Sequence, residues 1–306
     1  MEIFQDATSM RTWSRRQHST GHRIAFVPTM GYLHEGHLSL VRAASEHGDR
    51  VVASIYVNPT QFAPHEDFDV YPRDTEGDLE KLRNLGCHAV FMPRELYENG
   101  KEHHLAWVTV SELQSPLCGR SRPTFFRGVA TVVAKLFNIV EPDVAVFGRK
   151  DYQQWRIIST MVADLNFDID VIGMPIVRDA DGLAMSSRNA MLSPDARARA
   201  VALPQSLARV GEMVRREGIR DVDTLSGVVR AQIEAAGGKV DYAEFVCAER
   251  LTSPPPAQGK WLVAVAAHFG TVRLIDNREI DVHPVHASDG PAPNELSALE
   301  SGPVST

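Results

Sequence analysis

The fold of this chain is decided at residues 27–41, Val27-Pro28-Thr29-Met30-Gly31-Tyr32-Leu33-His34-Glu35-Gly36-His37-Leu38-Ser39-Leu40-Val41. The apolar residues 24–27 predict a short buried strand, which we expect Pro28 to end. From Leu38 onward, apolar residues recur at a spacing typical of a helix. Gly31 and Gly36 allow the backbone between these elements to turn sharply and a ligand to approach closely. The stretch therefore predicts a turn that joins a strand to a helix, with a binding site at that turn.

His34 and His37 lie in the turn between this strand and this helix. The exposed N–H groups and the dipole at a helix start favour an anion, and two imidazole donors beside them favour a polyphosphate. The alternative is that both are polar surface histidines at an ordinary helix start. A zinc-protease site is excluded, because the motif His-Glu-x-x-His requires histidines four residues apart. These two are three apart, and no third ligand is evident.

Composition narrows the class of protein. A chain of 306 residues suits one large or two ordinary domains, and its net charge of −7 argues against a general nucleic-acid binder. No apolar run approaches the length of a membrane span, and the N-terminus lacks the pattern of a secretory signal. Cys87, Cys118 and Cys247 are isolated, which suggests reduced thiols. We therefore expect a cytoplasmic protein without a nucleic-acid or membrane partner.

Strand and helix patterns alternate along the first half of the chain. Strands are predicted at residues 24–27, 50–57, 89–93, 107–110, 144–147 and 169–175, and helices at 6–18, from 38 onward, 74–85, 129–140 and 151–164. This alternation is typical of an α/β domain with a parallel sheet, in which ligands bind beyond the carboxyl ends of the strands. Asn58 and Gln61 follow the second of these strands. We expect them to meet His34 and His37 in one crevice.

The composition changes after Asn189. Residues 194–216 have helical periodicity that Pro204 would interrupt, and 221–236 form a second predicted helix. Strands are predicted at 240–246, 261–267 and 271–275, with 268–270 as the turn between the last two. The tail from about His283 lacks apolar periodicity and is expected to be disordered. We predict a Rossmann-like domain at 1–175, a smaller α+β domain at 176–282 and a tail at 283–306.

Five blocks of sequence, in order and spacing, resemble the pantothenate synthetase family. They are residues 28–37, Asn58-Pro59-Thr60-Gln61-Phe62, Arg122-Pro123-Thr124, Phe147-Gly148-Arg149-Lys150-Asp151-Tyr152-Gln153-Gln154 and Asp181-Gly182-Leu183-Ala184-Met185-Ser186-Ser187-Arg188-Asn189. The first block also resembles the His-x-Gly-His signature of the nucleotidyltransferase and class I synthetase superfamily. The resemblance extends over residues 1 to 282. It implies that pantoate and ATP form pantoyl adenylate and pyrophosphate, and that β-alanine then displaces AMP to give pantothenate.

The resemblance also implies which residues carry catalysis. Attack of a carboxylate on the α-phosphorus places negative charge on phosphate oxygens, and fixed donors aimed at that charge are the main catalytic device. His34 and His37 would supply donors, and Lys150 a compact positive charge. Ser186, Ser187 and Arg188 would form a mobile loop that closes over the triphosphate. Mg²⁺ would arrive on the ATP phosphates and neutralise them further, without a metal site of the protein's own.

Further residues are assigned to the ligands by the same resemblance. Gln61 and Gln154 would bind pantoate, because an amide can accept from a hydroxyl and donate to a carboxylate. Gln61 would also contact β-alanine. The substrate set is completed by Asn58, Met30 and Arg122. The other residues expected to bind ATP are Met30, Gly31, Gly36, Gly148, Arg149, Asp151, Val177 and Met185, with Asp151 either on the ribose or positioning the magnesium.

Other interpretations of these residues stay open. Gln61 is also compatible with a helix start in a loop, and Lys150 with a solvated pair formed with Asp151. Ser186 and Ser187 are also typical of an N-cap, and Asp181-Gly182 of a plain turn.

Two positions depart from the family pattern. Arg149 stands where the family usually has an acidic residue, and Phe125 where it often has histidine. Arg149 is expected either to strengthen phosphate binding or to point away from the nucleotide.

Two other functions are alternatives to this one. The first is a cytidylyl- or adenylyltransferase of the same superfamily, which would leave the nucleotide on its product. The second is a non-catalytic nucleotide-binding protein, which the full set of predicted catalytic residues disfavours. The family resemblance further implies a homodimer whose smaller domain acts as a lid.

Overall fold

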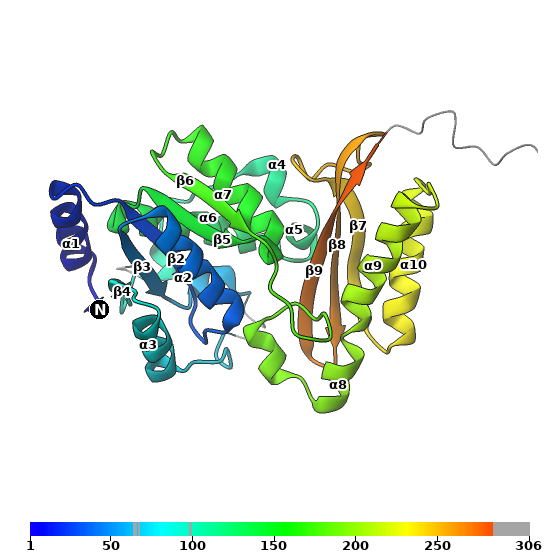
Figure 1. Cartoon of the computed structure of the whole chain (residues 1–306), viewed down its shortest axis with the longest axis horizontal. Coiled ribbons are helices and arrows are strands. Elements are labelled where there is room, and N and C mark those ends of the chain that lie inside the picture. The colour runs from blue at the N-terminus through cyan, green and yellow to red at the C-terminus, as the bar shows by residue number, and fades with distance from the viewer. Residues whose placement is uncertain (64–65, 67, 98–99, 284–306) are drawn as a thin grey trace, which may run out of the picture.

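Six parallel strands form the larger sheet, in the order β1-β4-β3-β2-β5-β6 (Figure 1). The computed structural model describes residues 1–63, 66, 68–97 and 100–283, so the predicted tail lies, apart from His283, outside the described residues. The strands are β1 (Glu2–Phe4), β2 (Ile24–Thr29), β3 (Arg50–Ile55), β4 (Ala89–Phe91), β5 (Val144–Gly148) and β6 (Asp170–Met174). The predicted parallel α/β sheet is therefore confirmed.

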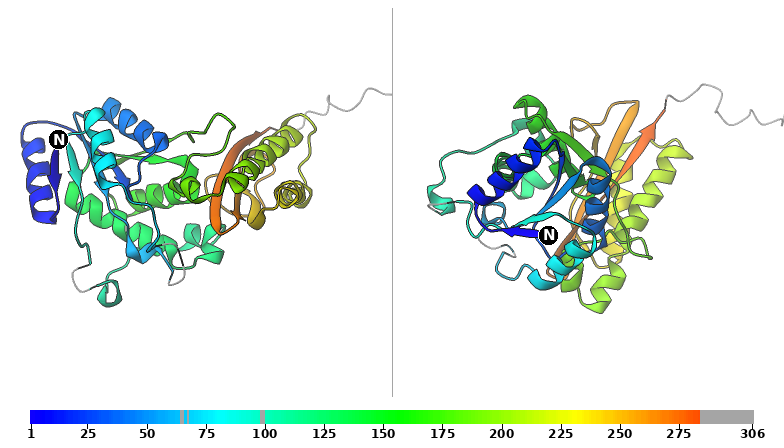
Figure 2. Two further views of the ribbon diagram at one scale, coloured as in Figure 1. Left: turned by 90° about the horizontal axis from the view of Figure 1, so that it is seen from below. Right: turned by 60° about the vertical axis from the view of Figure 1, so that its left-hand side comes forward.

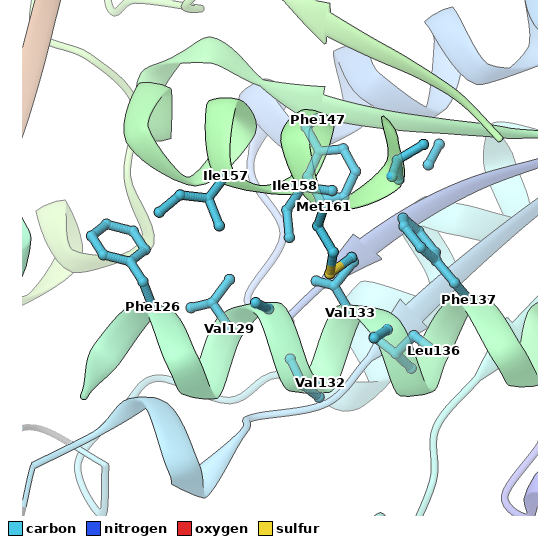
Figure 3. Packing of buried hydrophobic residues seen from close by; sticks show 14 of the residues in the cluster. Phe126, Val129, Val132, Val133, Leu136, Phe137, Phe147, Ile157, Ile158 and Met161 are labelled. Carbon is cyan, nitrogen blue, oxygen red and sulfur yellow. The ribbon is translucent and has the colours of Figure 1, made fainter. Parts of the chain in front are cut away.

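Alternate residues of the central strands enter separate cores on the two faces of this sheet, as the two-residue period of a strand requires. In β2, Ile24 and Phe26 join the core under α1, α6 and α7, whereas Ala25 and Val27 join the core under α2 and α3. Figure 3 shows the packing between α6 and α7. The helices are α1 (Ala7–Ser19), α2 (Glu35–His47), α3 (Thr75–Asn84), α6 (Phe125–Val140) and α7 (Tyr152–Asp164), with two short helices at α4 (Ser111–Gln114) and α5 (Cys118–Ser121).

Three antiparallel strands, β7 (Lys239–Cys247), β8 (Gly259–Phe269) and β9 (Val272–Val282), form the second sheet in that order. One face packs on α9 (Ala202–Arg215) and α10 (Val222–Ala235). The other face, with Leu262 and Ala264, shares a core with α6 and α7 of the larger sheet. The small sheet thus stands between its own helices and the first half of the chain (Figures 1 and 2).

Several predicted boundaries in the first half are wrong. β2 continues through Pro28 to Thr29. At Pro28 the strand pairs with β3 on one side only, because its pairing with β5 is confined to Ala25 and Phe26. A proline is tolerated there because its missing N–H can face the unpaired side. Helix α2 begins at Glu35, three residues before the expected start. Residues 107–110 do not form a strand, and the N–H of Val108 donates to the Thr131 hydroxyl at 3.0 Å instead. The short edge strand β1 was not predicted.

Boundaries in the second half also shift. The turn between β8 and β9 is Gly270-Thr271, and His268 and Phe269 belong to β8, where they pair with Arg273 and Val272. The helix predicted over 194–216 is divided into α8 (Pro194–Arg199) and α9. The break precedes Pro204, which lies in the first turn of α9, where its missing N–H has no intrahelical partner to lose.

Candidate functional site

Two adjoining cavities open at the carboxyl ends of β2, β3 and β5. One, of about 200 Å³, lies over the start of α2, and the other, of about 500 Å³, lies between the larger sheet and strands β8 and β9. Residues from four distant parts of the sequence line both cavities: Met30, Gln61, Lys150, Asp151, Gln154, Ser186 and Arg188. The predicted crevice is therefore present, and it extends to the second sheet.

The turn before α2 is held by a carboxylate that no sequence motif marks. Asp78, on α3, is 1% exposed and accepts hydrogen bonds from the N–H groups of Tyr32 at 2.7 Å and Leu33 at 2.6 Å. Tyr32 has a φ of 51° and Gly31 a φ of 83°, so this turn uses left-handed backbone at two successive residues. Burial raises the pKa of the Asp78 carboxyl, although the two N–H donors oppose that rise. In the sequence, Asp78 was visible only as one acidic residue of a charged amphipathic helix.

The His34 and His37 rings both accept hydrogen bonds from backbone N–H groups at the start of α2. The Nδ1 atom of His34 accepts from the N–H of Gly36 at 3.1 Å, and the Nδ1 atom of His37 accepts from the N–H of His34 at 3.4 Å. In a neutral imidazole whose Nδ1 is an acceptor, Nε2 carries the proton. Each ring therefore has one N–H donor left, and both side chains line the smaller cavity.

Both imidazoles are neutral at physiological pH. Burial, followed by the charge of Lys150, lowers the pKa of His34 to about 4. Burial, followed by the neighbouring His34 and then Lys150, lowers the pKa of His37 to about 3. Since the ordinary value is about 6.5, these side chains act as fixed neutral donors. Gly36 is required between them, because a Cβ there would lie 2.9 Å from the His34 ring.

The Gln61 side chain is fixed by its neighbours. Its Nε2 atom donates to the Met30 sulfur at 2.9 Å, and its Oε1 atom accepts from Asn58 Nδ2 at 3.1 Å. Gln61 ends the short 3-10 helix η1 (Pro59–Gln61), whose N-cap is Asn58. The helix-start interpretation therefore applies to Asn58, which is buried and bonded to the chain through both side-chain polar atoms. Gln154 lines both cavities beside Gln61.

Arg122 lies behind Gln61. Its Nε atom donates to Glu66 Oε1 at 2.6 Å, and its guanidinium also donates to the Gln61 carbonyl at 3.1 Å. The same guanidinium stacks on the Phe125 ring, 3.8 Å from its centroid. Phe125, one of the two departures from the family pattern, therefore supports Arg122 by a cation–π contact.

The turn after β5 carries Lys150. Gly148 ends the strand, and the 3-10 helix η3 (Arg149–Asp151) follows, with Lys150 Nζ 3.6 Å from Asp151 Oδ2. The Arg149 guanidinium points to the second sheet, where it pairs with Glu279 of β9 at 3.1 Å. Of the two expectations for Arg149, the geometry therefore fits the one in which its charge lies away from the nucleotide.

A hairpin presents Ser186, Ser187 and Arg188. Met185 donates its N–H to the Val177 carbonyl at 3.0 Å, and Gly182 at the tip has a φ of 91°, as a tight turn requires. Ser186 accepts from the N–H of Arg188 and is the N-cap of η4 (Ser187–Met191), so the N-cap interpretation holds for it.

Ser187 and Arg188 reach back to the larger sheet. The Ser187 hydroxyl donates to the Tyr32 carbonyl at 3.2 Å. The Arg188 guanidinium lies 5.5 Å from the centre of the Tyr71 ring. The hairpin thus meets the histidine turn at the crevice.

Two kinds of site are absent from the described residues. Among those residues no three His, Cys, Asp or Glu side chains are grouped as they would have to be to hold a metal ion. No described helix is both long and apolar enough to cross a bilayer.

Comparison with known proteins gives one consistent result. The family model described as pantoate-beta-alanine ligase matches residues 2–279. The chain is 49% identical over 305 residues to a pantoate–β-alanine ligase from Lotus japonicus, covering 92% of this chain and 99% of that protein. It is 50% identical over 282 residues to a pantothenate synthetase from Anaeromyxobacter dehalogenans, covering 90% and 97%.

Solved structures agree with these relatives. A pantothenate synthetase from Thermus thermophilus superposes with a TM-score of 0.84 at 39% identity, covering 93% of this chain and 100% of that one. A pantoate-β-alanine ligase from Francisella tularensis, complexed with β-γ ATP and β-alanine, gives a TM-score of 0.73 at 31% identity, covering 91% and 97%.

Proposed function

The chain belongs to the pantoate–β-alanine ligase family and is a ligase of pantothenate synthesis, and on that premise we propose how its residues divide the reaction. In the first step an oxygen of the pantoate carboxylate bonds to the α-phosphorus of ATP, and the bond from that phosphorus to pyrophosphate breaks. In the second, the amine of β-alanine attacks the acyl carbon of pantoyl adenylate, the carbon–oxygen bond breaks, and AMP leaves. Both steps take place in the crevice that the two cavities form.

One observation carries the assignment of the first step. The neutral imidazoles of His34 and His37, each with an Nε2–H donor, line the same cavity as Lys150, Ser186 and Arg188. Charge moves onto the phosphate oxygens during adenylate formation, and donors that are already fixed stabilise that charge without reorganising. A neutral imidazole N–H can donate to a phosphate oxygen without any change in its own protonation state.

The nucleotide lies between the histidine turn and the hairpin in this proposal. Met30, Gly31 and Gly36 approach it from the larger sheet, with Gly148 and Asp151 beside Lys150. Val177 and Met185 contribute from the hairpin with Ser187. Arg149 acts on this site only through the Lys150 turn, since its guanidinium is paired with Glu279.

Pantoate lies against Gln61 and Gln154, which line both cavities. Asn58 and Arg122 act in the same subsite by holding the Gln61 side chain and carbonyl. β-Alanine enters on the Gln61 side, where Met30 bounds the pocket.

Magnesium enters with the ATP phosphates, whose charge it neutralises. The carboxylate of Asp151 is an oxygen donor of the kind that Mg²⁺ prefers, and it lines both cavities. A single carboxylate suits an ion that keeps most of its ligands from phosphate and water. Dependence of pyrophosphate release on added Mg²⁺ tests this assignment.

The division of the chain is part of the proposal. Residues 1–175 form the domain that binds ATP and pantoate, and residues 176–282 form a lid whose separate core lies under α9 and α10. The family resemblance supports a homodimer, which light scattering after size exclusion tests. Three free cysteines support a cytoplasmic location, which fractionation of the source cells tests.

A coupled assay tests the function directly. The purified protein is given ATP, Mg²⁺ and pantoate, and AMP is followed before and after β-alanine is added. We expect free AMP only after β-alanine is present, together with one equivalent of pantothenate. A nucleotidyltransferase would instead keep the nucleotide on its product, and retention of AMP after β-alanine is added would contradict the proposal.

A further inference from the structure

Strand β9 carries two consecutive polar residues, Asp276 and Asn277, that are almost fully buried. Successive side chains of a strand point to opposite faces. Ile275 belongs to the core shared with the larger sheet, and Leu274 to the core under α9. Asn277 therefore faces the larger sheet and Asp276 the opposite side. The two side chains bind different segments of the active site.

Asn277 holds the turn that carries Lys150. Its Nδ2 atom donates to the carbonyl of Arg149 at 3.0 Å and to the carbonyl of Lys150 at 2.8 Å. A side-chain amide has two N–H donors, and here both are used on consecutive carbonyls of η3. The backbone that presents the Lys150 side chain is thus fixed by a residue from the second sheet.

Asp276 holds the hairpin that presents Ser186 and Arg188. Arg178, at the start of that hairpin, donates two hydrogen bonds to the Asp276 carboxylate, at 2.7 and 2.9 Å, and a third to the Gly182 carbonyl at 3.0 Å. The Asp276 side chain is 0% exposed. Bidentate pairs of this kind fix orientation as well as distance.

We propose that Asp276 and Asn277 are positioning residues for adenylate formation. One peptide unit joins them, and the N–H of Asn277 also donates to Asp276 Oδ1 at 2.7 Å. The Lys150 turn and the Ser186–Arg188 segment are thereby held at a set separation across the triphosphate. This inference rests on the proposed function, because it assigns those two segments to the phosphates. The second sheet then sets the geometry of the first half-reaction, in addition to covering the site.

The experiment compares the two half-reactions in Asn277→Leu. Pantoate-dependent exchange of pyrophosphate into ATP, without β-alanine, reports the first step. Conversion of supplied pantoyl adenylate by β-alanine reports the second, in which no triphosphate is held. We expect exchange to fall by about 10- to 100-fold, the scale of a misplaced reacting group. Conversion of the adenylate and the Kd of pantoate are expected to stay near those of the unchanged enzyme.

Two matched variants distinguish a positioning role of Asn277 from a general role of β9 in holding the two sheets together. Glu279 lies on the same face of β9 and binds the side chains of Arg149 and Tyr152, but no backbone carbonyl of η3. Glu279→Gln is expected to change exchange by no more than about threefold, as for a partly exposed ion pair. Asp281→Asn, at an exposed position on the same strand, is expected to leave exchange unchanged. An equal loss in Glu279→Gln and Asn277→Leu would overturn the proposal.

A second pair of variants guards against misfolding. If Asn277→Leu melts far below the unchanged enzyme, Asn277→Ser removes the amide without adding bulk and should give the same selective loss. Asp276→Asn should also weaken exchange, and the double variant should lose less than the product of the single losses, because both residues hold one geometry. Normal exchange in folded Asn277→Ser, or an equal loss in both half-reactions, would overturn the proposal. Absence of exchange in the unchanged enzyme would instead overturn the proposed function and this inference with it.

Discussion

Replacing Asp78 by alanine is expected to damage both the stability and the first step of the reaction. Two backbone N–H groups, of Tyr32 and Leu33, would lose the carboxylate that they bind at 2.7 and 2.6 Å. A buried donor left without a partner costs about 1–3 kcal/mol, so the pair gives a loss of about 2–6 kcal/mol in the free energy of unfolding. The left-handed turn at Gly31 and Tyr32 would also lose its support.

The functional consequence follows from what that turn presents. His34 comes directly after it, and a shift of about 1 Å in a catalytic group can reduce a rate by about 10²-fold. We therefore expect pantoate-dependent pyrophosphate exchange to fall by about that factor in Asp78→Ala. Urea unfolding gives the stability and the exchange assay gives the rate.

A control lies one turn away on the same helix. Asp74 is the N-cap of α3 and accepts from the N–H of Gly77 at 3.1 Å, but it does not contact the histidine turn. Asp74→Ala should cost about 1 kcal/mol, the usual value of a lost cap, with little effect on exchange. An Asp78→Ala variant that is no less stable and no slower than Asp74→Ala would refute the role of Asp78 in holding the turn.

Three further predictions concern the ligands and the histidines. Gln61→Ala and Gln154→Ala should weaken pantoate binding more than ATP binding, and calorimetry that showed a selective loss of ATP affinity would reject their assignment. Because burial lowers the pKa of His34 to about 4 and of His37 to about 3, their ring protons should show no titration in NMR spectra above about pH 5, and a titration near 6.5 would disprove their burial. As the pH falls below the unfolded pKa of about 6.5, the unfolded chain gains protons that the folded chain does not. These two histidines should therefore lower the free energy of unfolding progressively until about pH 3–4. Residues 179–185 should be protected from hydrogen exchange without ATP, since their hairpin is bonded to β9, and ATP should add protection at 186–189; equal exchange at 186–189 with and without ATP would contradict closure of that segment.

Much of the larger sheet could be predicted because its strands are continuous apolar runs. β3 and β5, buried on both faces, could be recognised for that reason. β1 could not, because three residues at a sheet edge carry little periodicity. The strand predicted at residues 107–110 is absent from the structure. These residues alternate as a strand does, but in the described part of the chain no neighbouring strand pairs with them.

Only the part of the site that lies in short sequence motifs could be predicted. Ser186 and Lys150 lie in recognisable blocks, and the structure brings them to the same crevice. The early start of α2 was missed because its N-cap is histidine, which is not among the residues that usually cap helices. Asp78 and Asn277 were missed because their importance comes from partners 45 and 127 residues away in the chain. No local pattern reveals such contacts.

The central claim is that the turn at His34 and His37 serves adenylate formation. His37→Ala tests it most directly, through pantoate-dependent pyrophosphate exchange without β-alanine, set beside conversion of supplied pantoyl adenylate with β-alanine. Loss of one fixed donor should reduce exchange by about 10²-fold or more, while conversion of the adenylate falls much less. An equal fall in both steps at an unchanged melting temperature would show that His37 acts in both, and unaffected exchange would contradict the claim.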